Sequence, residues 1–106
     1  MDIKFFRGND HQVKFKFKTF TGTPENIVFA VKSLTNEKLI VKKLNEGITK
    51  DDEWYVITFI PEDTTDINYD LKMKYAIKVI VDGKQYTAQR GKFILDDEVI
   101  RPADEV

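Results

Sequence analysis

The chain has 106 residues, no cysteine, and a formal net charge of −1 from 17 basic and 18 acidic residues. This length fits a single domain with one hydrophobic core. The lack of cysteine excludes a disulfide framework, thiolate metal sites and a cysteine nucleophile, and the near-neutral charge argues against polyanion binding as the main task.

Apolar and polar residues alternate along most of the chain, which is the period of half-buried strands, and helical periodicity is nearly absent. The alternation predicts seven strands, at residues 2–6, 12–19, 27–34, 38–44, 54–60, 72–81 and 84–95.

Turn signals separate these strands. In chain order they are a loop with Gly22, Pro24 and Asn26, a tight hairpin "TNEK", an acidic loop "NEGITKDDE", a short helical crossover within residues 61–70, and an Asp82-Gly83 hairpin turn. Gly91 predicts a bulge inside the last strand. Seven short strands with one crossover predict an all-β, two-sheet antiparallel sandwich.

Alternation also predicts which side chains form the core. One row contains Val13, Phe15 and Phe17, and the others are Ile27, Phe29 and Val31; Tyr55, Ile57 and Phe59; and Met73, Tyr75, Ile77 and Val79. Each large side chain contributes roughly 1.5–3 kcal/mol when buried, before its entropy cost.

The stretch "HQVKFKFKTF" at 11–20 alternates lysines with apolar residues. A single-strand nucleic-acid platform needs aromatic rings and cations on the same surface. The period of two instead places Phe15 and Phe17 opposite Lys14, Lys16 and Lys18. The lysines are therefore expected to form a solvated strand face, and no nucleic-acid partner is predicted.

The strand "WYVITFI" at 54–60 is apolar on both faces. If Tyr55, Ile57 and Phe59 belong to the core, Trp54, Val56 and Ile60 point outward. One alternative is that a loop or the N-terminal strand covers them, or that the opposite face is the core one. The other is that they form an interface with another subunit, because a large outward apolar patch marks a contact surface.

No active site is predicted. The acidic clusters Asp51–Glu53 and Asp96–Glu98 lack the spacing of a calcium loop and are expected to be solvated loop charges. The lone His11 has no second histidine or nucleophile signature beside it. We therefore expect no catalytic residue, no metal and no cofactor.

Charge is sorted into blocks along the chain. Residues 1–43 carry nine basic and four acidic groups, 44–70 carry one and eight, 71–92 carry six and one, and 93–106 carry one and five. Such blocks could orient copies of the chain against one another. The favoured interpretation is that solvated strand faces use lysine, which discourages edge pairing, while loops use aspartate.

The order of several motifs resembles a known family. These motifs are "FFRGND" before "VKFKFK", then "IVFAVKS", "VITFIPEDTTDI" and "YAIKVIVDGKQYTAQRGKFIL". Together they are similar to the immunoglobulin-like domain of bacteriophage tail and baseplate proteins, in particular the N-terminal domain of the baseplate upper protein family. The crossover "TTDINYDLKMKY" departs from the family pattern, because it lacks the Pro-Gly that often precedes the aromatic strand.

The resemblance implies an immunoglobulin-like sandwich over residues 1–101, with 102–106 as a flexible C-terminal tail. It also implies a structural or adaptor component of a phage or prophage tail, which assembles with other tail proteins or with itself. We expect a virion protein made in the host cytoplasm, with no secretory signal and no apolar run of about 18 residues to span a membrane. The alternative is a module that binds carbohydrate or a cell surface, with Trp54 beside Tyr55, Tyr69 or Tyr86.

Overall fold

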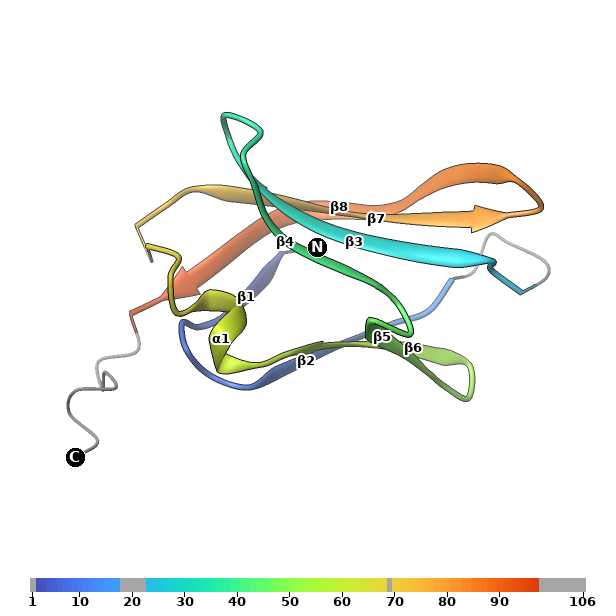
Figure 1. The fold of residues 1–106 in the computed structure, drawn as a ribbon, viewed down its shortest axis with the longest axis horizontal. Helices are drawn as coiled ribbons and strands as arrows, with labels where there is room; N and C mark the ends of the chain where they lie inside the picture. The colour runs from blue at the N-terminus through green and yellow to red at the C-terminus, as the bar shows by residue number, and fades with distance from the viewer. Residues whose placement is uncertain (1, 18–22, 69, 98–106) are drawn as a thin grey trace.

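The computed structural model describes residues 2–17, 23–68 and 70–97 (Figure 1). Within these ranges the structure is all-β apart from one helical turn. In chain order the elements are β1 (Ile3–Phe6), β2 (His11–Phe15), β3 (Asn26–Ser33), β4 (Lys38–Leu44), β5 (Gly47–Asp51), β6 (Trp54–Phe59), α1 (Pro61–Thr64), β7 (Met73–Val81) and β8 (Lys84–Asp96).

All eight strands belong to one hydrogen-bonded sheet with the order β1-β8-β7-β3-β4-β5-β6-β2. The sheet curls until it is nearly a barrel. In Figure 1, β3, β7 and β8 lie in one layer, and β2, β5 and β6 lie in a second layer facing it. The two layers are joined at one corner, where β4 and β5 share only two residue pairs, Lys43 with Gly47 and Leu44 with Ile48.

The seven predicted strands are all present, but the architecture differs from the prediction in three respects. The strands form one continuous sheet rather than two separate sheets. An eighth strand, β5, lies where an acidic loop was expected. In addition, β1 pairs with β8 and β4 pairs with β5 in parallel, so the sheet is mixed rather than purely antiparallel.

The strand β5 was missed because Ile48 is its only large apolar residue. That side chain is completely buried. Gly47, which begins the strand, has a φ of +100° and lies against the Lys42 side chain. One buried isoleucine and one glycine in the left-handed region thus define a strand with too few apolar residues to show alternation.

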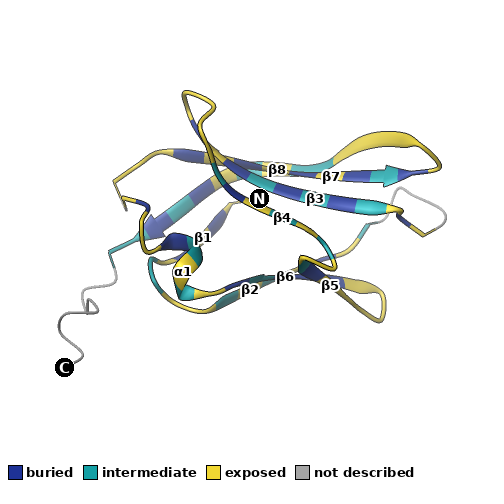
Figure 2. Ribbon diagram, in the orientation of Figure 1, coloured by how far each residue is buried: buried dark blue, intermediate teal, exposed yellow. Residues whose placement is uncertain are grey.

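The predicted core is largely confirmed (Figure 2). The three inner rows predicted from 27–31, 55–59 and 73–79 are all buried, as is Phe15, while Val13 and Phe17 are partly buried and pack against the core cluster. Phe93 and Leu95 of β8 are buried too. The rings of Phe29, Phe59 and Phe93 lie 5.6–6.3 Å apart at tilted or edge-on angles, which are favourable aromatic geometries.

The turn predictions have different outcomes. Asp82 and Gly83 have φ values of 51° and 75°, so the two-residue hairpin turn is confirmed. The crossover does form a helical turn, α1. The bulge of β8 is not at Gly91, however: Gly91 pairs with Tyr75, and the register shifts opposite Ile77 and Lys78, where Ala88 is the extra residue.

The proposed tail at 102–106 and the loop glycine Gly22 lie outside the described residues. No helix in the described ranges is long and apolar enough to cross a lipid bilayer.

Candidate binding surface

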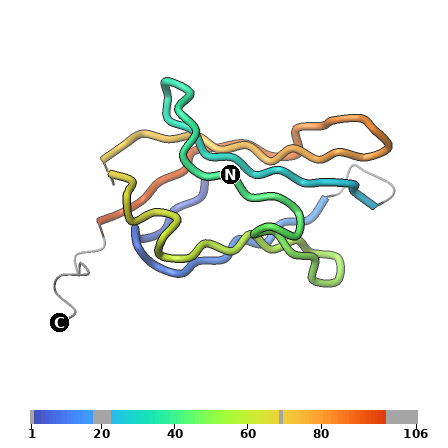
Figure 3. The backbone as a smooth tube through the Cα atoms, viewed as in Figure 1, coloured from blue at the N-terminus to red at the C-terminus, as the bar shows by residue number. Residues whose placement is uncertain are grey.

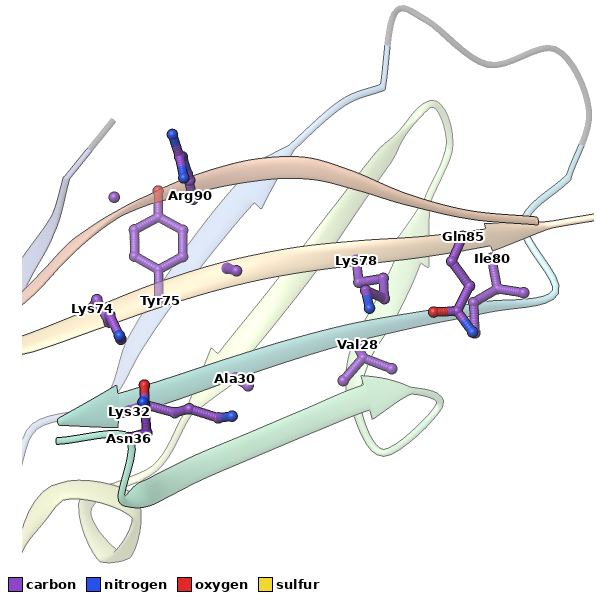
Figure 4. Close-up of a pocket in the computed structure, with 12 residues that line it drawn as sticks. Val28, Ala30, Lys32, Asn36, Lys74, Tyr75, Lys78, Ile80, Gln85 and Arg90 are labelled. Carbon is purple, nitrogen blue, oxygen red and sulfur yellow. The ribbon is translucent and has the colours of Figure 1, made fainter. Parts of the chain in front are cut away.

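A groove of about 810 Å³ lies on the outer face of β3, β7 and β8 (Figure 4). Its floor is apolar, formed by Val28, Ala30, Ala76 and Ile80. Four cationic side chains line it: Lys32, Lys74, Lys78 and Arg90.

Strand register explains why these cations gather on one face. Residues directly opposite in an antiparallel pair project on the same side of the sheet. Lys32 pairs with Lys38 on one side and Lys74 on the other, and Lys74 pairs in turn with Lys92. Four lysines therefore lie side by side across β4, β3, β7 and β8, and we refer to them as the lysine row.

A second set of cations lies two or four residue pairs farther along the same face. Ala76 pairs with Arg90, and Val28 pairs with both Lys43 and Lys78. We define the basic face as these seven residues: Lys32, Lys38, Lys43, Lys74, Lys78, Arg90 and Lys92.

The strand ladders place no carboxylate beside the cations of the basic face, and among the described residues the one carboxylate recorded as bonded to a residue of this face is Asp2, which accepts a hydrogen bond from the backbone N–H of Lys92. No Asp or Glu is among the residues that pair in the β3–β4, β3–β7 and β7–β8 ladders. The ion pairs recorded between described residues involve Lys4, Lys16 and Lys42, none of which belongs to this face. Like charges directly opposite on a sheet are destabilising. The face is therefore a surface whose charge is left for water or for an anionic partner.

The fold brings the two basic blocks of the sequence together. Residues up to 43 supply β3 and β4, and residues 71–92 supply β7 and most of β8. The interpretation favoured from the sequence is that these blocks are lysine on solvated strand faces. Alternation did place them outward, but only the strand order β4-β3-β7-β8, which joins segments about 40 residues apart, makes them one surface.

The acidic block lies in the other layer. Its most exposed part is the tip of the β5–β6 hairpin, where Asp51 pairs with Trp54 and Asp52 and Glu53 form the connection. Asp52 has a φ of 54°, a conformation that aspartate tolerates better than most residues. We refer to Asp51, Asp52, Glu53 and Trp54 as the acidic hairpin tip.

Lys16 holds one side of this tip. Its Nζ lies 2.7 Å from Glu53 Oε2 and 5.8 Å from the centroid of the Trp54 ring. The hydrogen bond from Lys16, and then its positive charge, lower the pKa of Glu53. Glu53 is already paired, whereas Asp51 and Asp52 have no recorded bond to another described side chain.

The predicted interface residues have different environments. Trp54 and Ile60 are each 45% exposed, but Val56 is buried, with 7% of its surface accessible. Val56 thus shares the outer face with Lys14 and Thr49, as alternation predicts, but its surface is covered. Strand β6 is paired along both edges, and Lys14 of β2 and Thr49 of β5 flank Val56 on its face.

Trp54 and Ile60 are also far apart. Trp54 begins β6 and Ile60 directly follows its last residue, so the two are six residues or roughly 20 Å apart along extended chain. Half-buried Thr58 and buried Val56 lie between them. The structure thus exposes two separate apolar side chains here rather than a continuous apolar patch.

The lysine comb is placed as predicted where the structure describes it. Lys14 and Lys16 are exposed, and Phe15 on the opposite face is buried. Lys18 lies outside the described residues.

The other candidates from the sequence are His11 and the acidic clusters, of which Glu98 lies outside the described residues. His11 stacks on Phe5, with ring centroids 4.5 Å apart. Among the described residues, no three histidine or acidic side chains come together in a way that could hold a metal ion.

The aromatic residues suggested for sugar binding are not gathered. Tyr55 is buried beside Phe15 and Phe17, and Tyr86 is exposed on β8 of the other layer. Tyr69 lies outside the described residues. Trp54 does line a shallow depression, together with Lys50, Asp52 and Glu53.

Comparisons with known proteins do not add a relative. No protein-family model matches the chain, and the search of curated proteins found none with significant sequence similarity.

Proposed function

We propose that this chain is a non-catalytic structural or adaptor module of a bacteriophage or prophage tail or baseplate, made in the host cytoplasm and carried in the virion. It acts by protein–protein assembly. The order of sequence motifs motivates the tail assignment. The observation that carries the assembly mechanism is the separation of charge, with an uncompensated basic face on one layer and an acidic hairpin tip on the other.

The immunoglobulin-like classification belongs to the same proposal. Its support is the two-layer arrangement of Figure 1 and the short corner, where only two residue pairs connect the layers. With that corner opened, β1-β8-β7-β3-β4 and β5-β6-β2 would be two packed sheets, as in a sandwich.

The direct test is to look for the chain in purified particles. Virions of the phage or induced prophage that encodes it should contain the chain in a fixed ratio to the tail proteins, as measured by quantitative mass spectrometry. Tailless capsids from the same preparation are the matched control and should lack it. Recovery of the chain only from the particle-free lysate would contradict the proposal.

A carbohydrate-binding module is the second candidate, because one observation favours it. Sugars stack on exposed aromatic rings beside polar groups, and Trp54 lies in a depression with Lys50, Asp52 and Glu53. Binding to a glycan array that is abolished by Trp54→Ala and retained by Tyr86→Ala would establish this function instead.

A further inference from the structure

The basic face and the acidic hairpin tip have complementary chemistry. We infer that the groove in the basic face is the docking site for the β5–β6 hairpin of a second copy of this chain. This inference rests on the proposed assembly function and names its partner and both contact surfaces.

Two properties of the groove, its charge and its apolar floor, determine which segment can bind there. The cations Lys32, Lys74 and Lys78 favour a negatively charged partner, because they have no carboxylate beside them on the sheet. Between them, Val28 and Ala30 form an apolar floor (Figure 4). Covering this floor with an apolar group removes apolar surface from water and so favours binding. The groove therefore fits a segment that carries carboxylates and an apolar side chain together.

A nucleic acid meets only the first requirement. Its phosphates would neutralise the lysines, but sequence-tolerant binding of single strands also uses aromatic side chains on which bases stack. Tyr75 lines the groove but is buried in the sheet, with 3% of its surface exposed. Bases would find no exposed ring among the lining residues.

The acidic hairpin tip meets both requirements. Asp51 and Trp54 are directly opposite on the hairpin and so project from the same face, and Asp52 follows in the connection. The exposed indole of Trp54 can cover the apolar floor while Asp51 and Asp52 approach the lysines. The two-residue connection keeps the acidic hairpin tip narrow, so that the tip can enter a groove along a sheet face.

The contact has to form between molecules. Within one chain the groove is on the outer side of the β3-β7-β8 layer, whereas the β5–β6 hairpin belongs to the opposite layer (Figure 1). Groove and tip are different surfaces, so the contact is head to tail. Each copy uses its tip on one neighbour and its groove on another, which produces a ring or an open row of copies.

Neutral substitutions give a sharp test, because each removes only one of the two surfaces. The groove variant is Lys32→Gln/Lys74→Gln/Lys78→Gln, and the tip variant is Asp51→Asn/Asp52→Asn/Trp54→Ala. Asparagine at position 52 tolerates the positive φ of the turn. All of these positions are at the surface, so circular dichroism should show folded proteins.

Sedimentation velocity over a range of concentrations measures assembly. The wild-type chain should form oligomers that weaken as salt is raised, because salt screens the contact. Each variant alone should associate at least about tenfold more weakly, a loss of roughly 1.4 kcal/mol. An equimolar mixture should form a 1:1 dimer and nothing larger, because only the intact tip of one variant and the intact groove of the other remain.

The matched control is Lys14→Gln, an exposed lysine of β2 outside both surfaces, which should assemble like the wild type. A wild-type chain that stays monomeric at all concentrations and salt levels overturns the inference. So does a mixture of the two variants that fails to associate. A monomer whose groove binds an oligonucleotide, with loss in the groove variant only, also overturns it and assigns the face to a polyanion.

Failure of this inference and failure of the proposed function give different results. A chain that is present in tail particles but does not self-associate remains an adaptor whose partner is another tail protein. A chain that self-associates through groove and tip but is absent from particles keeps the docking contact and loses the tail assignment.

Discussion

Lys42 and Asp63 form a nearly buried ion pair, in which Lys42 Nζ lies 2.7 Å from Asp63 Oδ2 and the two side chains are 13% and 18% exposed. The same carboxylate oxygen accepts a hydrogen bond of 2.9 Å from the backbone N–H of Ile60, at the start of α1. One carboxylate thus joins β4 to the crossover that leads from β6 to β7.

Removing this carboxylate should destabilise the fold. Asp63→Ala leaves Lys42 with a buried, unpaired charge and α1 without its cap, and we expect a loss of about 3 kcal/mol in the free energy of unfolding. Urea denaturation followed by tryptophan fluorescence measures it. The control is Lys4→Ala, because Lys4 Nζ is 3.6 Å from Asp96 Oδ2 and the Lys4 side chain is 61% exposed. That exposed pair should contribute no more than about 0.5 kcal/mol, and an equal loss in both variants would contradict the argument.

Replacing the glycine that begins β5 should destabilise the fold. Gly47 has a φ of +100°, and a Cβ there would lie 2.5 Å from Cδ of Lys42, the residue that holds Asp63. Gly47→Ala therefore adds a steric clash to backbone strain, and we expect a cost of about 2–3 kcal/mol. The melting temperature provides the measurement.

Gly8 is the matched control for Gly47. Its φ is +78°, but nothing lies within 4 Å of the position a Cβ would take. Gly8→Ala should therefore cost only the strain, about 1 kcal/mol. A Gly47→Ala variant no less stable than Gly8→Ala would show that Lys42 moves aside freely.

Much of the fold was accessible from the sequence because most strands bury large side chains on one face. The rows of Phe29, Ile57 and Ile77 follow from the period of two alone. Strand β5 could not be found that way, since its pairing depends on Gly47 approaching Lys42 and on one buried isoleucine. Alternation gives the outward direction of Val56 but not its burial, because burial depends on the neighbouring strands β2 and β5.

The candidate surface was less accessible, because it depends on strand order rather than on any local motif. The predicted core rows 27–31 and 73–79 imply that Lys32, Lys74 and Lys78 point outward, and all three are exposed. That they share one face follows from β3 pairing with both β4 and β7, a long-range relationship that periodicity does not encode.

The pairing of Glu53 with Lys16 makes a pH-dependent prediction. The hydrogen bond and charge of Lys16 lower the pKa of Glu53 below its ordinary value of 4.5. A carboxylate whose pKa is lowered by folding stabilises the fold fully above its unfolded pKa, and that contribution is lost as the pH falls through the folded pKa. Carboxyl NMR titration should show a low midpoint for Glu53, which Lys16→Met should return toward 4.5. An unchanged midpoint in that variant would mean that Lys16 is not the cause.

Repulsion within the lysine row should lower the free energy of unfolding of the isolated chain. Lys74 is directly opposite Lys32 and in register with Lys92, so Lys74→Thr removes repulsion on both sides. We expect the variant to be more stable than the wild type by about 0.5 kcal/mol at low salt, with a smaller gain at high salt where the charges are screened. Lys14→Thr, which lies opposite Val56, is the control for the higher strand propensity of threonine. A gain from Lys74→Thr that does not change with salt would indicate propensity rather than repulsion.

The parallel pairing of β1 with β8 has a mechanical consequence. Ile3 is beside Phe93 and Phe6 is beside Asp96, so the start of the described chain and its end are tied together by four neighbouring residue pairs. Because the strands run in the same direction, tension between residues 2 and 97 pulls them along their length in opposite senses. Their hydrogen bonds, which lie across the strands, then share the load in shear rather than opening one after another as in a peeled hairpin. A domain attached at both ends would transmit force through this short clamp while the groove and the hairpin tip remain unloaded.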